Sequence, residues 1–133
     1  MSNVTNYAEK LLLDWILTTG SATRPTAWFA SLHTGDPGET GASELSSGSG
    51  YARQSASFAA AVDPAGTTTN QNALTFGPAA TSNWGTVSGV GIVDMSTLGS
   101  GNFLFAGLLA TARVVAIGDS LQIASGSLVV QMS

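Results

Sequence analysis

The chain has 133 residues, a length that allows one domain with a sizeable core but not two. Only 9% of its residues are charged, against roughly 25% in ordinary soluble domains, whereas 44% are hydrophobic, so the composition excludes intrinsic disorder. A net charge of −4 with four scattered basic residues argues against nucleic-acid binding, and the absence of cysteine excludes disulfides and zinc–thiolate sites.

The first predicted element is an amphipathic helix over residues 4–19, within an N-terminal helical segment at 1–20. Asn6 and Glu9 form a start similar to a capping box, and Gly20 is expected to end the helix in the left-handed conformation. Leu13 and Leu17 widen the apolar side beyond what one sheet surface usually covers. The helix therefore packs either on its own domain or on a neighbouring subunit. Its main apolar face is formed by Val4, Tyr7, Ala8, Leu11, Leu12, Trp15 and Ile16.

The hydrophobic run at 11–17 within this helix bears on targeting. It is much shorter than the ~20 residues of a bilayer span, and Asp14 interrupts it. No basic segment precedes it and no small-residue cleavage site follows it, so a signal peptide is not predicted either. We expect a protein made inside the cell, with no membrane partner.

After Pro25 the pattern predicts strands without further helices. A turn is predicted at 63–66, and glycines at 85, 89 and 91 indicate a bulge or a close backbone approach. The strand at 121–124 is expected to pair back on its predecessor. Short strands separated by turns predict a mainly β fold, a single domain over 1–133 with a β-sandwich over 26–133, and a jelly roll as the favoured variant. The predicted strands cover 26–33, 51–61, 73–76, 84–95, 103–108, 111–116, 121–124 and 128–132.

A long loop rich in glycine and serine, residues 34–50, connects the first two predicted strands. Loops of this length in compact domains are usually binding loops or disordered tips. Its carboxylates Asp36, Glu39 and Glu44 could form a glycosidase-like pair or bind calcium, but neither pattern is complete, and solvated loop carboxylates are the default. Arg53 is either an exposed edge charge or a residue that reaches a carboxylate such as Asp36 and holds the loop; we favour the second.

His33 is the one histidine of the chain. With Asp36 and a nearby serine it could form a Ser-His-Asp site, but no motif places a serine at a nucleophile elbow. A histidine at a strand end beside a Gly-Asp-Pro-Gly turn predicts a structural hydrogen-bonding residue. The Gly89-Val90-Gly91 segment lacks the third glycine and the following helix of a dinucleotide site. We therefore expect no catalytic residue, no cofactor and no metal.

An ordered set of short motifs resembles a family of small tailed-bacteriophage virion proteins. The motifs are Ala-Trp-Phe-Ala-Ser-Leu-His-Thr-Gly-Asp-Pro at 27–37, Ser-Gly-Tyr-Ala-Arg-Gln at 49–54, Ala-Leu-Thr-Phe at 73–76, Trp-Gly-Thr-Val at 84–87, Gly-Ile at 91–92 and Gly-Asp-Ser-Leu at 118–121. Members of this family are labelled tail-fibre proteins or head decoration (cement) proteins. The resemblance thus implies a structural part of the virion and transfers no catalytic residue.

The resemblance and the low charge together predict a capsid cement protein, located in the virion after synthesis in the host cytoplasm. Many copies would bridge capsid subunits and stabilise the head. A weakly charged surface carries little repulsion between copies, so the expected partners are the major capsid protein and the chain itself, as a dimer or trimer. A neutral-surfaced monomer is the alternative. The predicted interface residues are Leu11, Leu12, Trp15, Ile16, Asp36, Glu39 and Glu44.

Two other functions stay open. A tail-fibre or tail-tip module that binds a host receptor predicts few copies per particle and an exposed aromatic patch, with Tyr51 or Trp84 stacking on sugars. An enzyme predicts the loss of an activity in His33→Ala, whereas a structural histidine predicts a loss of thermal stability in that variant.

Overall fold

The computed structural model describes residues 3–64 and 66–132. Ala65, in the predicted turn at 63–66, and the ends of the predicted 1–133 domain lie outside the described residues. Within them the chain forms one helix and nine strands, so the prediction of a mainly β protein with one N-terminal helix is confirmed. The elements are β1 (Asn3–Val4), α1 (Asn6–Leu17), β2 (Phe29–His33), β3 (Gln54–Ser55), β4 (Thr67–Thr69), β5 (Leu74–Phe76), β6 (Gly85–Val93), β7 (Phe103–Val115), β8 (Leu121–Ile123) and β9 (Val129–Gln131).

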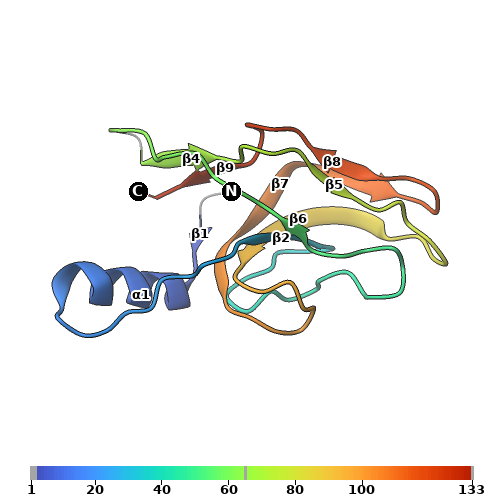
Figure 1. Ribbon diagram of the computed structural model, residues 1–133. Coiled ribbons are helices and arrows are strands. Elements are labelled where there is room, and N and C mark those ends of the chain that lie inside the picture. Colours follow the sequence, from blue (N-terminus) through green and yellow to red (C-terminus); the bar gives the residue numbers. More distant parts are fainter. Residues whose placement is uncertain (1–2, 65, 133) are drawn as a thin grey trace.

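The strands form three antiparallel sheets. The main sheet has five strands in the order β1-β7-β6-β2-β3, while β4 pairs with β9 and β5 pairs with β8. In Figure 1 the two small sheets lie above the main sheet, and α1 extends to one side below them. The described strands thus form one five-stranded sheet and two two-stranded sheets. This arrangement does not confirm the prediction of a jelly roll.

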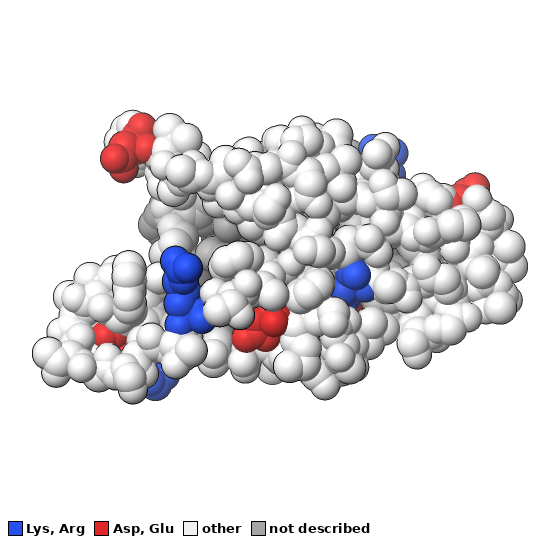
Figure 2. All heavy atoms as spheres, in the orientation of Figure 1, with Lys and Arg blue, Asp and Glu red and all other residues white. Residues whose placement is uncertain are grey.

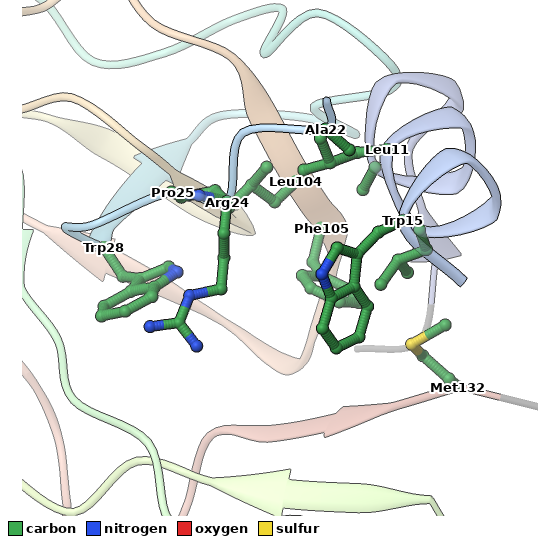
Figure 3. Close-up of a pocket in the computed structure, with 11 residues that line it drawn as sticks. Leu11, Trp15, Ala22, Arg24, Pro25, Trp28, Leu104, Phe105 and Met132 are labelled. Atoms are coloured by element: carbon green, nitrogen blue, oxygen red, sulfur yellow. The ribbon is translucent and has the colours of Figure 1, made fainter. Parts of the chain in front are cut away.

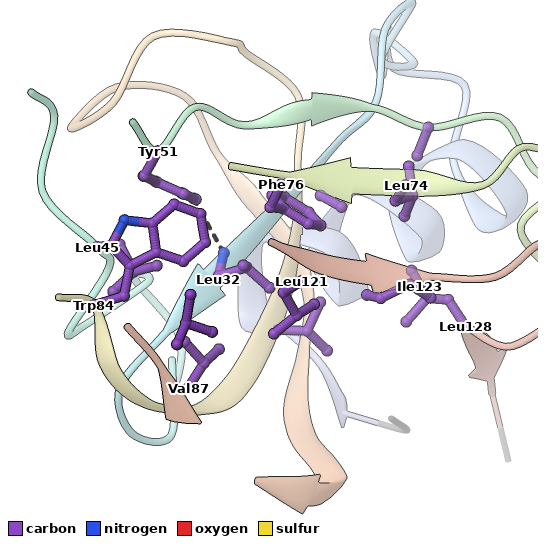
Figure 4. Close-up of a cluster of buried hydrophobic side chains, with 14 of the residues drawn as sticks. Leu32, Leu45, Tyr51, Leu74, Phe76, Trp84, Val87, Leu121, Ile123 and Leu128 are labelled. Carbon is purple, nitrogen blue, oxygen red and sulfur yellow. Dashed lines mark hydrogen bonds between the residues drawn. The ribbon is translucent and has the colours of Figure 1, made fainter. Parts of the chain in front are cut away.

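The core lies between the main sheet and the two small sheets. Leu32 and Val87 of the main sheet are fully buried, as is Phe76 of β5, and their side chains meet in Figure 4. At one end the rings of Tyr51 and Trp84 pack edge to face, with centroids 5.9 Å apart. Burial of this apolar surface is the main driving force for folding.

The N-cap of helix α1 lies one residue earlier than the sequence predicts. Thr5, not Asn6, is the N-cap: its hydroxyl accepts the N–H of Ala8 at 3.3 Å. The same hydroxyl, which is buried, donates to the carbonyl oxygen of Leu104 at the start of β7 at 3.1 Å. The backbone N–H of Thr5 donates to that oxygen at 3.0 Å. Residues 3–4 therefore join the main sheet as β1, and the helix occupies 6–17 instead of the predicted 4–19.

The end of α1 also differs from the prediction. The C-cap is Thr18, whose φ of −124° is extended, and Gly20 does not adopt the left-handed conformation. With 12 residues, α1 is the sole helix of the described chain, and it is too short to cross a membrane.

Strand β7 is one continuous strand where the sequence predicted two, at 103–108 and 111–116. Opposite β6 it advances five positions, from Leu108 to Arg113, while β6 advances only two, from Val87 to Gly89. This register shift lies at the glycine-rich part of β6, where a bulge was predicted. Strand β8 pairs with β5 and not with the preceding strand, so the predicted pairing was wrong.

The segment at 51–61 was predicted as one alternating strand, but regular pairing is limited to β3. Tyr51 and Arg53 are buried, and the next buried position is Ala56, so the alternation changes phase within the segment. Strand β4 was missed, because its three threonines are all half-buried and carry no alternating pattern.

Candidate interaction surface

His33 lies at the base of the 34–50 loop and is completely buried. Its Nδ1–H donates to the carbonyl oxygen of Ala42 at 2.8 Å, which leaves Nε2 as the acceptor for the hydroxyl of Ser31 at 2.8 Å. Ser31 is equally buried. A serine–histidine pair is thus present, but it is closed to any substrate, and its third partner is a backbone carbonyl and not Asp36.

Arg53 and Glu44 form an ion pair between the loop and the segment after it. The Arg53 side chain is 0% exposed and that of Glu44 is 11% exposed. Nη2 and Nε of Arg53 donate to the two Glu44 oxygens, each over 2.7 Å. The hydroxyl of Tyr51 donates to Glu44 at 2.7 Å and accepts the N–H of Leu32 at 3.0 Å. Arg53 therefore holds the loop through Glu44, where the sequence suggested Asp36.

The third nitrogen of Arg53 holds a second loop. Its Nη1 donates to the carbonyl oxygens of Met95, Thr97 and Ser100 at 2.8, 2.8 and 2.9 Å. These residues lie in the connection between β6 and β7. A single guanidinium thus joins the 34–50 loop to the 94–102 loop, with all of its nitrogens engaged.

Both His33 and Glu44 should make the protein less stable in acid. Burial lowers the pKa of His33 from its usual 6.5, despite the opposing effects of the Ala42 carbonyl and Glu44. Burial alone would raise the pKa of Glu44, but hydrogen bonds from Arg53 and Tyr51 and the Arg53 charge outweigh it and lower that pKa below its usual 4.5. Each group therefore binds protons more readily in the unfolded chain, so stability falls as the pH drops below 6.5 and falls further below 4.5.

Urea unfolding at a series of pH values between neutral and acid tests this prediction. His33→Gln should flatten the part of the profile between pH 6.5 and 4.5, because the chain has no second histidine. The comparison uses the slope with pH, so a uniform loss of stability in the variant does not affect it. A wild-type profile that is flat from neutral pH down to pH 4.5 would contradict the prediction.

Helix α1 contacts the rest of the molecule through a small part of its surface. Ala8 is its one buried residue with a described side chain. Leu13, Ile16 and Leu17 are 57%, 65% and 73% exposed on the outer side of the helix; we name these three residues the α1 ridge. The single charge among residues 11–17 is Asp14, which already pairs with Lys10 at 2.5 Å. A helix segment that is apolar on all sides is normally buried.

A groove of about 210 Å³ runs along the other side of α1. In Figure 3 the Trp15 side chain projects from α1 into the groove, with Met132 below it and Trp28 on the opposite side. A second cavity of about 240 Å³ shares Trp28 and Phe105 and continues between the sheets to Val130. We name the first cavity the α1 groove; its lining is Ala8, Leu11, Leu12, Trp15, Ala22, Arg24, Pro25, Trp28, Leu104, Phe105 and Met132.

Charged side chains are sparse on the face shown in Figure 2, where isolated blue and red groups are separated by wide uncharged areas. Two ion pairs are formed among residues 3–64 and 66–132, and one of them is the buried Arg53–Glu44 pair. Around α1 the charges are those of Glu9, Lys10, Asp14, Arg24 and Glu39, so both signs accompany its exposed apolar residues.

The predicted interface residues separate into three groups in the structure. Leu11, Leu12 and Trp15 line the α1 groove, whereas Ile16 belongs to the α1 ridge. The loop carboxylates point to different partners: Glu44 turns inward to Arg53, the Asp36 carboxylate accepts the N–H of Gly38, and Glu39 accepts the N–H of Asn6 at 2.6 Å. Nowhere in the described part of the chain do three His, Asp or Glu side chains gather as metal ligands.

The contact between Glu39 and Asn6 brings the loop to the start of the helix. A carboxylate at this place interacts favourably with the free N–H groups and the positive end of the helix dipole. The 34–50 loop and α1 are therefore neighbours, a contact that no sequence pattern predicts.

The sequence did not predict the side of the α1 groove that faces α1, and it predicted the wrong aromatic residues to be exposed. Ala22, Trp28, Phe105 and Met132 come from separate segments, and no periodicity joins them. Tyr51 and Trp84, proposed for stacking on sugars, are 5% and 6% exposed, and the Trp84 N–H is engaged with the Ser49 carbonyl at 2.8 Å. That expectation was wrong. The aromatic residues with large exposure are Tyr7 and Trp15, both on α1.

Comparison with known proteins gives one family match. Residues 3–131 match the model of the family described as Gp80, podophage GP4 fiber I protein gp80. No curated protein sequence matches the chain. The match spans α1 and all the strands of the described chain, from β1 to β9, so it covers the whole fold and not an isolated motif.

Proposed function

The chain belongs to the podophage GP4 fiber I protein gp80 family, and from this membership we propose that it is a structural component of a podophage tail fibre. The family match carries the proposal. The resemblance to phage virion proteins is confirmed at the level of the family. The capsid cement role has no support in the family description, which favours the tail-fibre alternative.

Features of the molecule agree with a structural role. Both long loops are held by one buried arginine, and a projecting helix exposes Leu13, Trp15, Ile16 and Leu17. Tyr51 and Trp84 are buried, so these two residues do not form the sugar-stacking surface expected of a receptor-binding tip. Contact with the major capsid protein is not part of this proposal.

The location and copy number of the chain in purified phage particles test the proposal. Quantitative mass spectrometry should find far fewer copies of the chain than of the major capsid protein in the same sample. Gold-labelled antibodies against the chain should bind at the tail, while antibodies against the major capsid protein serve as the control and bind the head. A copy number close to that of the capsid protein, with label on the head, would overturn the fibre role and restore the cement role.

A further inference from the structure

We propose that α1 is a contact between copies of this chain, in which the α1 ridge of one copy packs into the α1 groove of another. This inference stands on the geometry of α1 and does not depend on the fibre assignment. Helix α1 carries apolar residues on both of its sides. Leu12 and Trp15 face the groove, while Leu13, Ile16 and Leu17 face solvent on the other side.

The amount of exposed apolar surface is large enough for a specific contact. The three ridge residues and Trp15 are each more than half exposed. If a large apolar side chain offers on the order of 200 Å², they present on the order of 500 Å² in total, of which the Trp15 part belongs to the groove lining. A stable interface buries about 800 Å² per partner, and monomers rarely expose apolar patches above about 300–600 Å². A single ridge-to-groove contact uses the ridge of one copy and the groove of the other, so a reciprocal contact, in which each copy contributes both, is needed to approach this area.

The charges around α1 favour a second copy as the occupant. The net charge of the chain is only −4, so the local charges at the contact decide whether two copies attract each other there. Asp14 is neutralised by Lys10 on the same helix. The groove carries one charge, the cation Arg24, and the outer side of α1 carries Glu9; neither has an ion-pair partner among residues 3–64 and 66–132. Packing of ridge into groove brings these opposite charges toward each other.

A membrane surface fits this helix less well. Helices that lie on membranes are usually rich in lysine and arginine on their polar face, since they bind anionic lipids. The polar residues of α1 include Glu9, Lys10 and Asp14, which sum to a negative charge. A second copy offers both an apolar groove and a matching charge, so it is the occupant that these observations favour.

The oligomeric state of the full chain tests the proposal. Light scattering coupled to size exclusion, over a hundredfold range of concentration, should give a mass of at least two chains for the wild type. Ile16→Glu should raise the dissociation constant by about a hundredfold or more, because its carboxylate would be buried in an apolar groove whose one cation, Arg24, is opposite Glu9 of the same incoming helix. Ala22→Trp, which fills the groove from an irregular segment, should have the same effect.

Val114→Glu is the matched control. Val114 is 75% exposed near the far end of β7, so this variant adds the same charge away from α1 and should keep the wild-type mass. Ile16 is 65% exposed, and circular dichroism of Ile16→Glu should show an unchanged fold. A wild-type chain that is monomeric at every concentration overturns the proposal. Retention of the oligomer in both Ile16→Glu and Ala22→Trp overturns it as well.

Discussion

Arg53→Met is expected to lower the free energy of unfolding by about 3–5 kcal/mol, the usual cost of removing one partner from a buried ion pair. The substitution keeps the length of the side chain but leaves the Glu44 carboxylate, whose side chain is 11% exposed, without its cation. It also removes the donor from the carbonyl oxygens of Met95, Thr97 and Ser100. Urea unfolding followed by circular dichroism measures the change.

Arg113→Met is the control for the Arg53 prediction. Arg113 lies exposed on β7, so its loss should change the free energy of unfolding by about 0.5 kcal/mol or less. Arg53→Lys should fall near the methionine variant, because lysine lacks the planar fork that reaches Glu44 and the backbone carbonyls together. Equal stability of Arg53→Met and Arg113→Met would contradict the role given to the buried guanidinium.

The second large effect is expected for Gly89→Ala, with a loss of about 1–3 kcal/mol from overpacking. A Cβ atom on Gly89 would lie 2.2 Å from the carbonyl oxygen of Gly35 and 2.9 Å from Cδ of Pro37. The first of these atoms belongs to the backbone, so the turn at the start of the 34–50 loop must move away from β6. Thermal unfolding gives the loss of stability. Hydrogen exchange at the Ala42 and Leu45 amides, which bond to Pro37 and Leu32, reports the loosened loop.

Ser88→Ala provides the matched control in the same strand. Its side chain makes no hydrogen bond among the described residues, and the change should stay within about 0.5 kcal/mol. If Gly89→Ala melts at the wild-type temperature with unchanged exchange in the loop, the close approach between β6 and the turn is not a constraint on the fold.

Local structure could be predicted from the sequence where a single residue type or a regular pattern determines it. The glycines of β6 predicted a close backbone approach, and Gly89 has one. The strand at 73–76 and the N-terminal helix followed from apolar periodicity. Contacts between residues far apart in the sequence could not be predicted in this way. Thr5 was not seen as a cap because its anchor is β7, almost a hundred residues away.

Strand β7 illustrates a second reason. Its positions from 110 to 114 are all exposed, so the segment lacks the apolar alternation that marks a half-buried strand, and its continuity rests on pairing with β6. The same limit applies to the α1 groove. Trp28, Phe105 and Met132 converge through the fold and not through a motif, whereas Leu11, Leu12 and Trp15 share a helix and were predicted together.

The inward anchoring of the 34–50 loop has an evolutionary consequence. His33, Glu44, Tyr51 and Arg53 fix its path from within. The side chains of Thr40 and Ser47 are exposed and make no hydrogen bond in the described chain, so replacing them should cost little stability. Successive generations could therefore alter the outer surface of this loop while the interior keeps its shape, and selection on external contacts would act almost independently of selection on folding.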